Sequence, residues 1–214
     1  MEQDRTKLAV ELFDAHSEVY EKKFMDVSPY HASLDSFCEA LPSGAVDVLE
    51  LACGPGNITK YVLDQRPELR ILATDLAPKM LKLSQVNNPG ASFQLLDCRD
   101  IPSLGRSFDG IIGGFCLPYL DQDQARTMIR DAAQALRRNG VLYLSTMEGD
   151  PSQSGWKISS NDPSYQLFMN YHTADLLTGL LSESGFTLVD LQRTQTYATA
   201  GTVYNDLLLT AKLS

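Results

Sequence analysis

Short apolar runs alternate with longer helical patterns through the middle of the chain. Runs rich in leucine and β-branched residues predict strands at 46–51, 70–74, 92–96, 108–113 and 141–147. Apolar positions at helical spacing predict helices over 57–65, 78–87 and 122–138, the last one closed by Asn139-Gly140. This alternation is typical of βαβ units, so we expect an α/β fold with a Rossmann-like, doubly wound, mostly parallel sheet.

The two ends of the chain add elements to this alternation. Residues 1–44 show helical patterns, and we expect them to form a helical lid. Residues 148–172 are largely polar and have no clear period until their end, which predicts a long functional connection. Thr173 can cap a following helix, and two strand patterns joined by ATAGTV predict an antiparallel C-terminal hairpin. The sheet should therefore hold about seven strands.

Composition and charge narrow the class of protein. The chain has 214 residues, 43% of them hydrophobic and 21% charged, which fits one globular domain over 1–214. A net charge of −9 disfavours nucleic acid as a partner, because that affinity depends on Lys and Arg. No signal peptide or long apolar segment is visible, so we expect no membrane association and a cytoplasmic location. The four cysteines lie far apart, which predicts reduced thiols and no metal site. The oligomeric state stays open.

The segment VDVLELACGPGN, residues 46–57, leads from a buried strand through a turn of small residues into a helix. Gly54 and Gly56 remove the Cβ atoms that would block a ligand, and the helix presents free N–H groups at its positive end. Such a turn indicates a nucleotide-like ligand. The dinucleotide fingerprint G-x-G-x-x-G needs glycine at position 59, where this chain has Thr59, which weakens an NAD interpretation.

Two further strands end in acids. Asp75 closes the strand in ILATDLAPKML, where a carboxylate can accept hydrogen bonds from two ribose hydroxyls. NAD-binding proteins have an acid at the same place, so Asp75 supports an adenosine ligand without choosing between cofactors. Asp97 follows the apolar run in FQLLDCRDIP. Because a carboxylate next to a buried strand is costly without a partner, a ligand role is favoured for both acids.

Taken in order, these segments resemble the class I S-adenosylmethionine-dependent methyltransferases. E-L-A-C-G-P-G matches the family's acid-x-G-x-G-x-G motif, with Ala52 in the place of the first glycine. The resemblance continues through SFDGIIGGFCLPYL, LRRNGVLYLSTM and YHTADLLTGLLSESGF, so it covers roughly residues 45–214. The chain lacks an N-P-P-Y-type tetrapeptide after the fourth strand. This departure argues against DNA-base and glutamine methylation and favours a small-molecule acceptor.

The resemblance implies S-adenosylmethionine as cofactor, S-adenosylhomocysteine as product and direct displacement of the methyl group. It assigns the ribose hydroxyls to Asp75 and the adenine amino group to Asp97. The expected cofactor contacts are Tyr20, Glu50, Ala52, Cys53, Gly54, Gly56, Asn57, Asp75, Leu76, Met80, Asp97, Cys98, Phe115 and Cys116. The cofactor-binding core would span 45–147, with the acceptor-side connection at 148–172 and a C-terminal helix and hairpin at 173–214.

Positioning of the acceptor is the expected main contribution to catalysis. If the acceptor must lose a proton, the candidate general bases are His172, His16 and Tyr119, in that order. His172 leads because it closes the segment expected to form the acceptor pocket. Two alternatives stay open: an NAD(P)-dependent Rossmann oxidoreductase, which shares the strand, turn and Asp75, and a non-catalytic module that retains the cofactor pocket.

Overall fold

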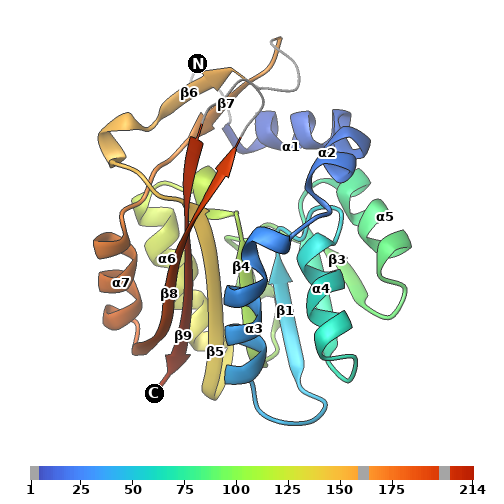
Figure 1. Ribbon diagram of the computed structural model, residues 1–214, viewed down its shortest axis with the longest axis vertical. Helices are drawn as coiled ribbons and strands as arrows, with labels where there is room; N and C mark the ends of the chain where they lie inside the picture. Colours follow the sequence, from blue (N-terminus) through green and yellow to red (C-terminus); the bar gives the residue numbers. More distant parts are fainter. Residues whose placement is uncertain (1–4, 159–163, 198–202) are drawn as a thin grey trace.

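One seven-stranded sheet organises the chain. The structure is a computed structural model that describes residues 5–158, 164–197 and 203–214 (Figure 1). The strands lie in the order β3-β2-β1-β4-β5-β9-β8. Six of them run in the same direction, and β9 runs in the opposite direction between β5 and β8. Their bounds are β1 Asp47–Leu51, β2 Arg70–Asp75, β3 Ser92–Leu95, β4 Phe108–Gly114, β5 Leu136–Met147, β8 Phe186–Tyr197 and β9 Val203–Leu213. The predicted doubly wound α/β fold with an antiparallel C-terminal strand is confirmed.

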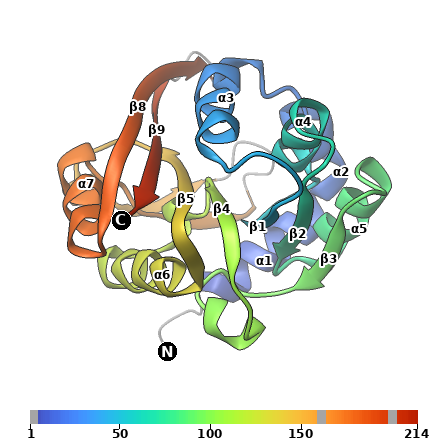
Figure 2. The ribbon, with the colours of Figure 1, turned by 90° about the horizontal axis from the view of Figure 1, so that it is seen from below.

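Helices cover both faces of the sheet (Figure 2). On one side lie α3 His31–Ala40, α4 Asn57–Gln65 and α5 Pro78–Asn87, and on the other α6 Gln122–Ala135 and α7 Ala174–Glu183. Successive residues of β1 belong to the cores on the two faces, since Val48 lies in the same hydrophobic cluster as Phe37 of α3 and Leu49 in the same cluster as Met128 of α6. Burial on both faces explains why the parallel strands are continuous apolar runs in the sequence.

The helix prediction over 122–138 is wrong at its end. Helix α6 stops at Ala135, and Leu136 already pairs with Phe108 as the first residue of β5. Asn139 adopts a left-handed backbone with φ 63°, next to a register shift between β4 and β5. The Asn139-Gly140 pair therefore forms an irregularity within a strand, because pairing with β4 outweighs the local signal for a helix stop.

The connection at 148–172 contains a small sheet of its own. Strands β6 Gly155–Ile158 and β7 Gln166–Met169 pair antiparallel, with Trp156 opposite Phe168 and their rings edge-on at 5.7 Å. Each strand has only four residues, too few for a recognisable period. The predicted C-terminal hairpin forms from β8 and β9, while most of its ATAGTV turn, 198–202, lies outside the described residues.

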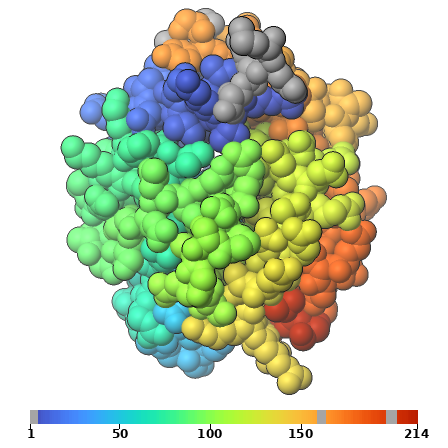
Figure 3. Space-filling model, turned by 180° about the vertical axis from the view of Figure 1, so that it is seen from behind, coloured from blue at the N-terminus to red at the C-terminus, as the bar shows by residue number. Residues whose placement is uncertain are grey.

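The helices of the N-terminal region occupy two places: the first two lie over the strand ends, and α3 packs on the face of the sheet. Helices α1 Arg5–Ala15 and α2 Ser17–Phe24 lie across the carboxyl ends of the strands (Figure 1). On the surface these N-terminal residues lie next to the β6–β7 segment (Figure 3). After η1 Ser28–Tyr30, α3 packs on the sheet and buries Phe37 completely. Within the predicted lid over 1–44, only α1 and α2 lie over the strand ends, and we keep the name lid for these two helices; their role as a lid stays a prediction. No described helix has the length and apolar character needed to cross a membrane.

Candidate cofactor site

The turn from β1 to α4 lies where the sheet reverses its strand order. The chain runs outward from β1 to β2 and β3 and then returns to β4 on the other side of β1. Ligands of open α/β sheets bind at the carboxyl ends of the strands at such a switch point. Within the turn, Ala52, Gly54 and Gly56 have φ values of 52°, 55° and 85°. The left-handed backbone at Ala52 explains why glycine suits this position of the motif.

Gly56 lies against the end of α5. A Cβ atom there would stand 2.2 Å from Asn88 Nδ2 and 2.4 Å from Ser84 Oγ. Asn88 Nδ2 donates to the Gly56 carbonyl at 2.9 Å, and Asn87 Nδ2 donates to the Pro55 carbonyl at 3.0 Å. Two asparagines that the sequence reasoning did not single out therefore hold the glycine turn in place.

Asp75 joins the end of β2 to the same turn. Its Oδ2 accepts a hydrogen bond from the Gly54 amide at 2.8 Å, and its Oδ1 accepts one from the Ala77 amide at 2.8 Å. Burial raises the pKa of this carboxyl even though backbone amides stabilise the ionised form. A largely buried carboxylate held by neutral donors beside a glycine turn is suited to accept ligand hydroxyls.

Asp97 already has a strong partner in Arg99. The guanidinium Nε lies 2.9 Å from Oδ1 and 3.1 Å from Oδ2, and the Arg99 amide donates to Oδ1 at 2.9 Å. Burial works toward a higher pKa for Asp97, but the bonds from Arg99 outweigh it, so this pKa is lowered. The neighbouring Cys98 thiol interacts with Cys116 after β4, and this contact together with burial raises the pKa of Cys98. The loops after β3 and β4 thus meet next to Asp97.

Glu50 lies beneath the turn and is only 1% exposed. It accepts a hydrogen bond from the Thr59 hydroxyl, which links β1 to α4. Burial raises the pKa of Glu50 to about 8, and the nearby charge of Asp75 acts in the same direction. Thr59, which stands where the dinucleotide fingerprint requires glycine, thus serves to hold this acid.

The remaining expected contacts differ in their surroundings. Cys53 is buried and its thiol lies 3.8 Å from Ser84 Oγ, directed toward α5. Met80 is also buried, whereas Leu76 is half-buried directly after Asp75. Phe115 follows β4 with a left-handed φ of 51°, so both strands that flank the switch point end in a strained non-glycine residue, Ala52 and Phe115.

Comparison with known proteins shows which family this part of the chain resembles. Residues 48–140 match the methyltransferase domain. This segment of the chain is therefore similar to a methyltransferase domain, and the curated relatives that the chain resembles are methyltransferases.

Among curated relatives, the malonyl-[acyl-carrier protein] O-methyltransferase of Acetivibrio thermocellus is 30% identical over 63% of this chain and 44% of its own length. The demethylmenaquinone methyltransferase of Thermotoga maritima is 27% identical over 64% of this chain and 61% of its own length. The chain thus spans less than two thirds of these relatives.

Solved methyltransferase structures share the fold over nearly the whole chain. The 1,6-didemethyltoxoflavin-N1-methyltransferase of Burkholderia thailandensis matches with a TM-score of 0.72 and 23% identity, covering 100% of this chain and 91% of that one. The magnesium protoporphyrin IX methyltransferase of Synechocystis PCC 6803 matches with a TM-score of 0.73 and 17% identity, covering 99% and 98%.

Aromatic side chains lie above the glycine turn. Phe13 of α1 packs edge-on against Tyr20 at 5.6 Å and against Tyr119 at 5.4 Å between ring centroids. A ring carbon of Tyr20 lies 3.8 Å from the point where a Cβ of Gly54 would stand. Burial raises the pKa of Tyr20 to about 12, with a smaller contribution from Asp75. Tyr20 therefore lies directly over the glycine turn, with Tyr119 behind the same aromatic cluster.

Three polar contacts fix the lid on α4 and α5. Asp14 Oδ1 accepts from the Lys79 amide at 2.8 Å, in the first turn of α5. Glu21 Oε1 accepts from Asn87 Nδ2 at 2.7 Å. Asn57 Nδ2 donates at 2.8 Å to the main-chain carbonyl that ends α2. Asn57, expected to contact the cofactor, thus contacts the lid in this structure.

The candidate bases have different surroundings. His172 is fully buried, and its Nε2 lies 3.1 Å from the carbonyl oxygens of both Leu117 and Leu120. Burial lowers the pKa of His172. His16 lies between α1 and α2, with its ring edge-on to Tyr165 at 5.3 Å. His172 thus supports the 3-10 turn Leu117–Tyr119, which carries Tyr119 to the lid.

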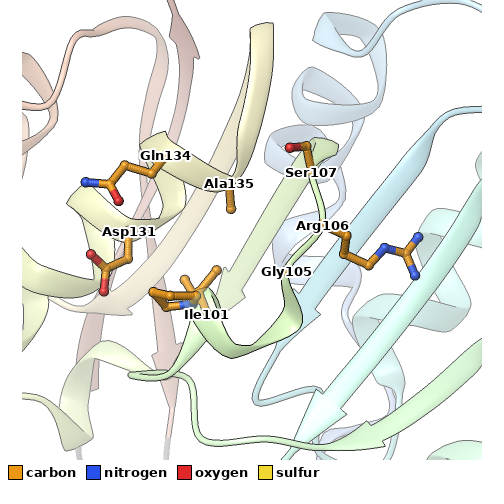
Figure 4. A pocket seen from close by; sticks show the side chains of 8 residues that line it. Ile101, Gly105, Arg106, Ser107, Asp131, Gln134 and Ala135 are labelled. Atoms are coloured by element: carbon orange, nitrogen blue, oxygen red, sulfur yellow. The ribbon is translucent and has the colours of Figure 1, made fainter.

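Two cavities of the described residues lie away from the glycine turn. One, of 280 Å³, is lined by residues of η2 Ile101–Leu104, by Arg106 before β4 and by Asp131 and Gln134 of α6 (Figure 4). It opens near the amino end of β4, opposite the edge where ligands bind. The other, of 210 Å³, is lined by Arg5, Phe168 and His172 among others, on the side of the β6–β7 segment.

Proposed function

We propose that the chain is an S-adenosylmethionine-dependent methyltransferase that transfers the methyl group to a small-molecule acceptor. The observation that carries the proposal is the meeting of the Gly54 amide and the Asp75 carboxylate, 2.8 Å apart, at the switch point of the sheet and beneath Tyr20. Relatives at 26–32% identity are named as methyltransferases, among them enzymes for demethylmenaquinone and trans-aconitate.

The residues present fit this cofactor. Gly54 and Gly56 leave no Cβ atom at two positions of the turn, and Asp75 offers a half-buried carboxylate for the ribose hydroxyls. Asp97 would hold the adenine amino group next to Cys98, sharing its oxygens with Arg99, while Phe115 and Cys116 would lie beside the methionine moiety. When bound, S-adenosylmethionine supplies an electrophilic methyl group on a positively charged sulfur. The proposed fit rests on the Asp75 and Asp97 carboxylates and on the open glycine turn.

The protein's contribution to transfer is positioning and exclusion of water. The aromatic cluster of Phe13, Tyr20 and Tyr119 covers the site, and desolvation strengthens charge interactions within it. His172, His16 and Tyr119 remain hypotheses for a general base, and the two carbonyls at His172 Nε2 favour a supporting role for that ring. The absence of nucleic-acid and membrane partners and the cytoplasmic location stay predictions.

Calorimetric titration tests the cofactor. S-adenosylhomocysteine should bind and NADH should not, and Asp75→Ala should cost about 1–3 kcal/mol of binding free energy, roughly 5- to 150-fold in Kd. Asp64→Ala is the matched control, because that acid lies on the exposed side of α4 in an ion pair with Lys60. An unchanged titration for Asp75→Ala would remove this acid from the site, and NADH binding alone would favour the oxidoreductase alternative. A binding-competent protein that transfers no labelled methyl group would favour the non-catalytic module.

A further inference from the structure

A buried carboxylate that the sequence reasoning did not single out lies on the acceptor side of the sheet. Asp206, near the start of β9, pairs with Met147 at the carboxyl end of β5 and is 2% exposed. Its Oδ2 accepts hydrogen bonds from the Tyr30 hydroxyl at 2.9 Å and from Thr196 Oγ1 at 2.8 Å. Within the described chain, the side-chain hydrogen bonds to this carboxylate converge on Oδ2, so Oδ1 is the oxygen that a ligand would use.

Tyr30 connects this carboxylate to the end of β4. Its ring centroid lies 5.3 Å from that of Phe115, the residue expected beside the methionine moiety. The Phe115 amide donates to the Ser145 carbonyl at 3.1 Å and to Ser145 Oγ at 3.0 Å, which fixes the strained backbone at this position. Asp206, Tyr30 and Phe115 therefore form one contiguous group, which lies at the carboxyl ends of β4 and β5 and near the start of β9.

When it is ionised, Asp206 has no cationic partner among the described residues. No ion pair of the described chain includes it, and both side chains that bond to it are neutral. Burial raises its pKa against the lowering effect of the Thr196 and Tyr30 hydrogen bonds, and the titratable side chains Tyr30 and Tyr143 face it. A buried carboxylate of this kind is stabilised by a further N–H or O–H donor, and it repels another carboxylate.

We propose that Asp206 is the acceptor-recognition residue of the proposed methyltransferase, accepting at Oδ1 a hydrogen bond from the N–H or O–H group of the acceptor. Tyr30 is a positioning residue that holds the carboxylate through Oδ2. The site therefore selects amines, phenols and alcohols and disfavours acceptors that present a carboxylate. This inference rests on the proposed function.

Methyl transfer from labelled S-adenosylmethionine to two sets of probes tests it. One set contains aromatic amines, imidazole and phenols, and the other contains carboxylic acids such as trans-aconitate. Transfer should occur in the donor set alone, and Asp206→Asn should lower kcat/KM there about tenfold or more. Tyr30→Phe should shift the acidic limb of the pH–rate profile to higher pH, because it removes a hydrogen bond that lowers the pKa of Asp206.

Asp190→Asn is the matched control. Asp190 of β8 is opposite Thr210 of β9, on the same face of the sheet as Asp206 but four residues farther from the carboxyl edge. This variant should keep wild-type transfer, and all variants should bind S-adenosylhomocysteine like the wild type. Transfer confined to the acids, absence of transfer in the donor set, or equal rates in Asp206→Asn and wild type would overturn the inference. Absence of S-adenosylhomocysteine binding by the wild type would instead refute the proposed function.

Discussion

Replacing Gly56 by alanine perturbs the site through two separable costs. The first is the left-handed backbone, since φ is +85° and an L-residue there costs about 1–2 kcal/mol. The second is space, because the new Cβ would stand 2.2 Å from Asn88 Nδ2. Asn88 must then move and release the Gly56 carbonyl, which leaves buried polar groups unpaired at a cost of about 1–3 kcal/mol. Together these terms predict a loss of about 2–5 kcal/mol.

Thermal unfolding followed by circular dichroism measures this loss. For a domain of this size, about 2–4 °C of Tm is lost per kcal/mol, so Tm should fall by about 4–20 °C. Gly44→Ala isolates the backbone cost, because Gly44 has φ +88° and nothing within 4 Å of the new Cβ. Gly90→Ala has an equally open site without a positive φ and should leave Tm nearly unchanged.

The comparison between Gly56→Ala and Gly44→Ala decides the argument. Equal Tm losses in the two variants would refute the claim that Asn88 and Ser84 confine position 56, and would reduce the effect to backbone conformation alone. A larger Tm loss in Gly56→Ala than in Gly44→Ala would show that Asn88 and Ser84 at the end of α5 confine this position. The S-adenosylhomocysteine affinity of the folded fraction should fall in Gly56→Ala and be unchanged in Gly44→Ala, which lies outside the turn.

Two further predictions concern the acid beneath the turn and the lid. The pKa of Glu50 is about 8 in the folded protein against an ordinary 4.5, so protonated Glu50 favours folding at low pH and this contribution is lost as pH rises from 4.5 to 8. Urea titrations at several pH values across this window measure the free energy of unfolding. For the wild type it should fall more steeply with pH than for Glu50→Gln, by up to about 1.4 kcal/mol per pH unit. Parallel pH dependence in the two proteins would contradict the raised pKa of Glu50. Asp14 caps the Lys79 amide of α5, whose own N-cap residue Ala77 has no capping side chain. Asp14→Ala should cost about 1 kcal/mol and speed limited proteolysis of the lid, whereas Asp64→Ala should not, and equal cleavage rates would show that the contact does not hold the lid.

Much of the cofactor side could be predicted from the sequence because its signals are local. A buried strand that ends in ACGPGN specifies the turn, and an acid at the end of a buried strand requires a partner wherever it occurs. Asp75 and Gly54 lie 21 residues apart in the chain, yet parallel pairing of β1 with β2 brings them into contact. The predicted helix end at residue 138 is wrong because Asn139-Gly140 is compatible with an irregularity in a strand as well as with the end of a helix.

The contacts of Tyr30 and Asp14 could not be predicted in the same way, because they join distant segments. The Tyr30 hydroxyl reaches Asp206 across 176 positions, and Asp14 caps a helix 65 positions away. Neither pair leaves a periodic or compositional trace, since the first depends on how η1 lies against β9 and the second on how α1 lies against α5.

The sequence by itself determined the α/β alternation, the glycine turn and the acids that follow the strands, because these depend on hydrophobic period and backbone freedom over a few residues. The tertiary structure decided which of those acids are buried, which already have partners, and which unpredicted side chains complete the site. Burial and charge pairing are properties of the assembled layers, so they arise only when segments far apart in the chain are packed together.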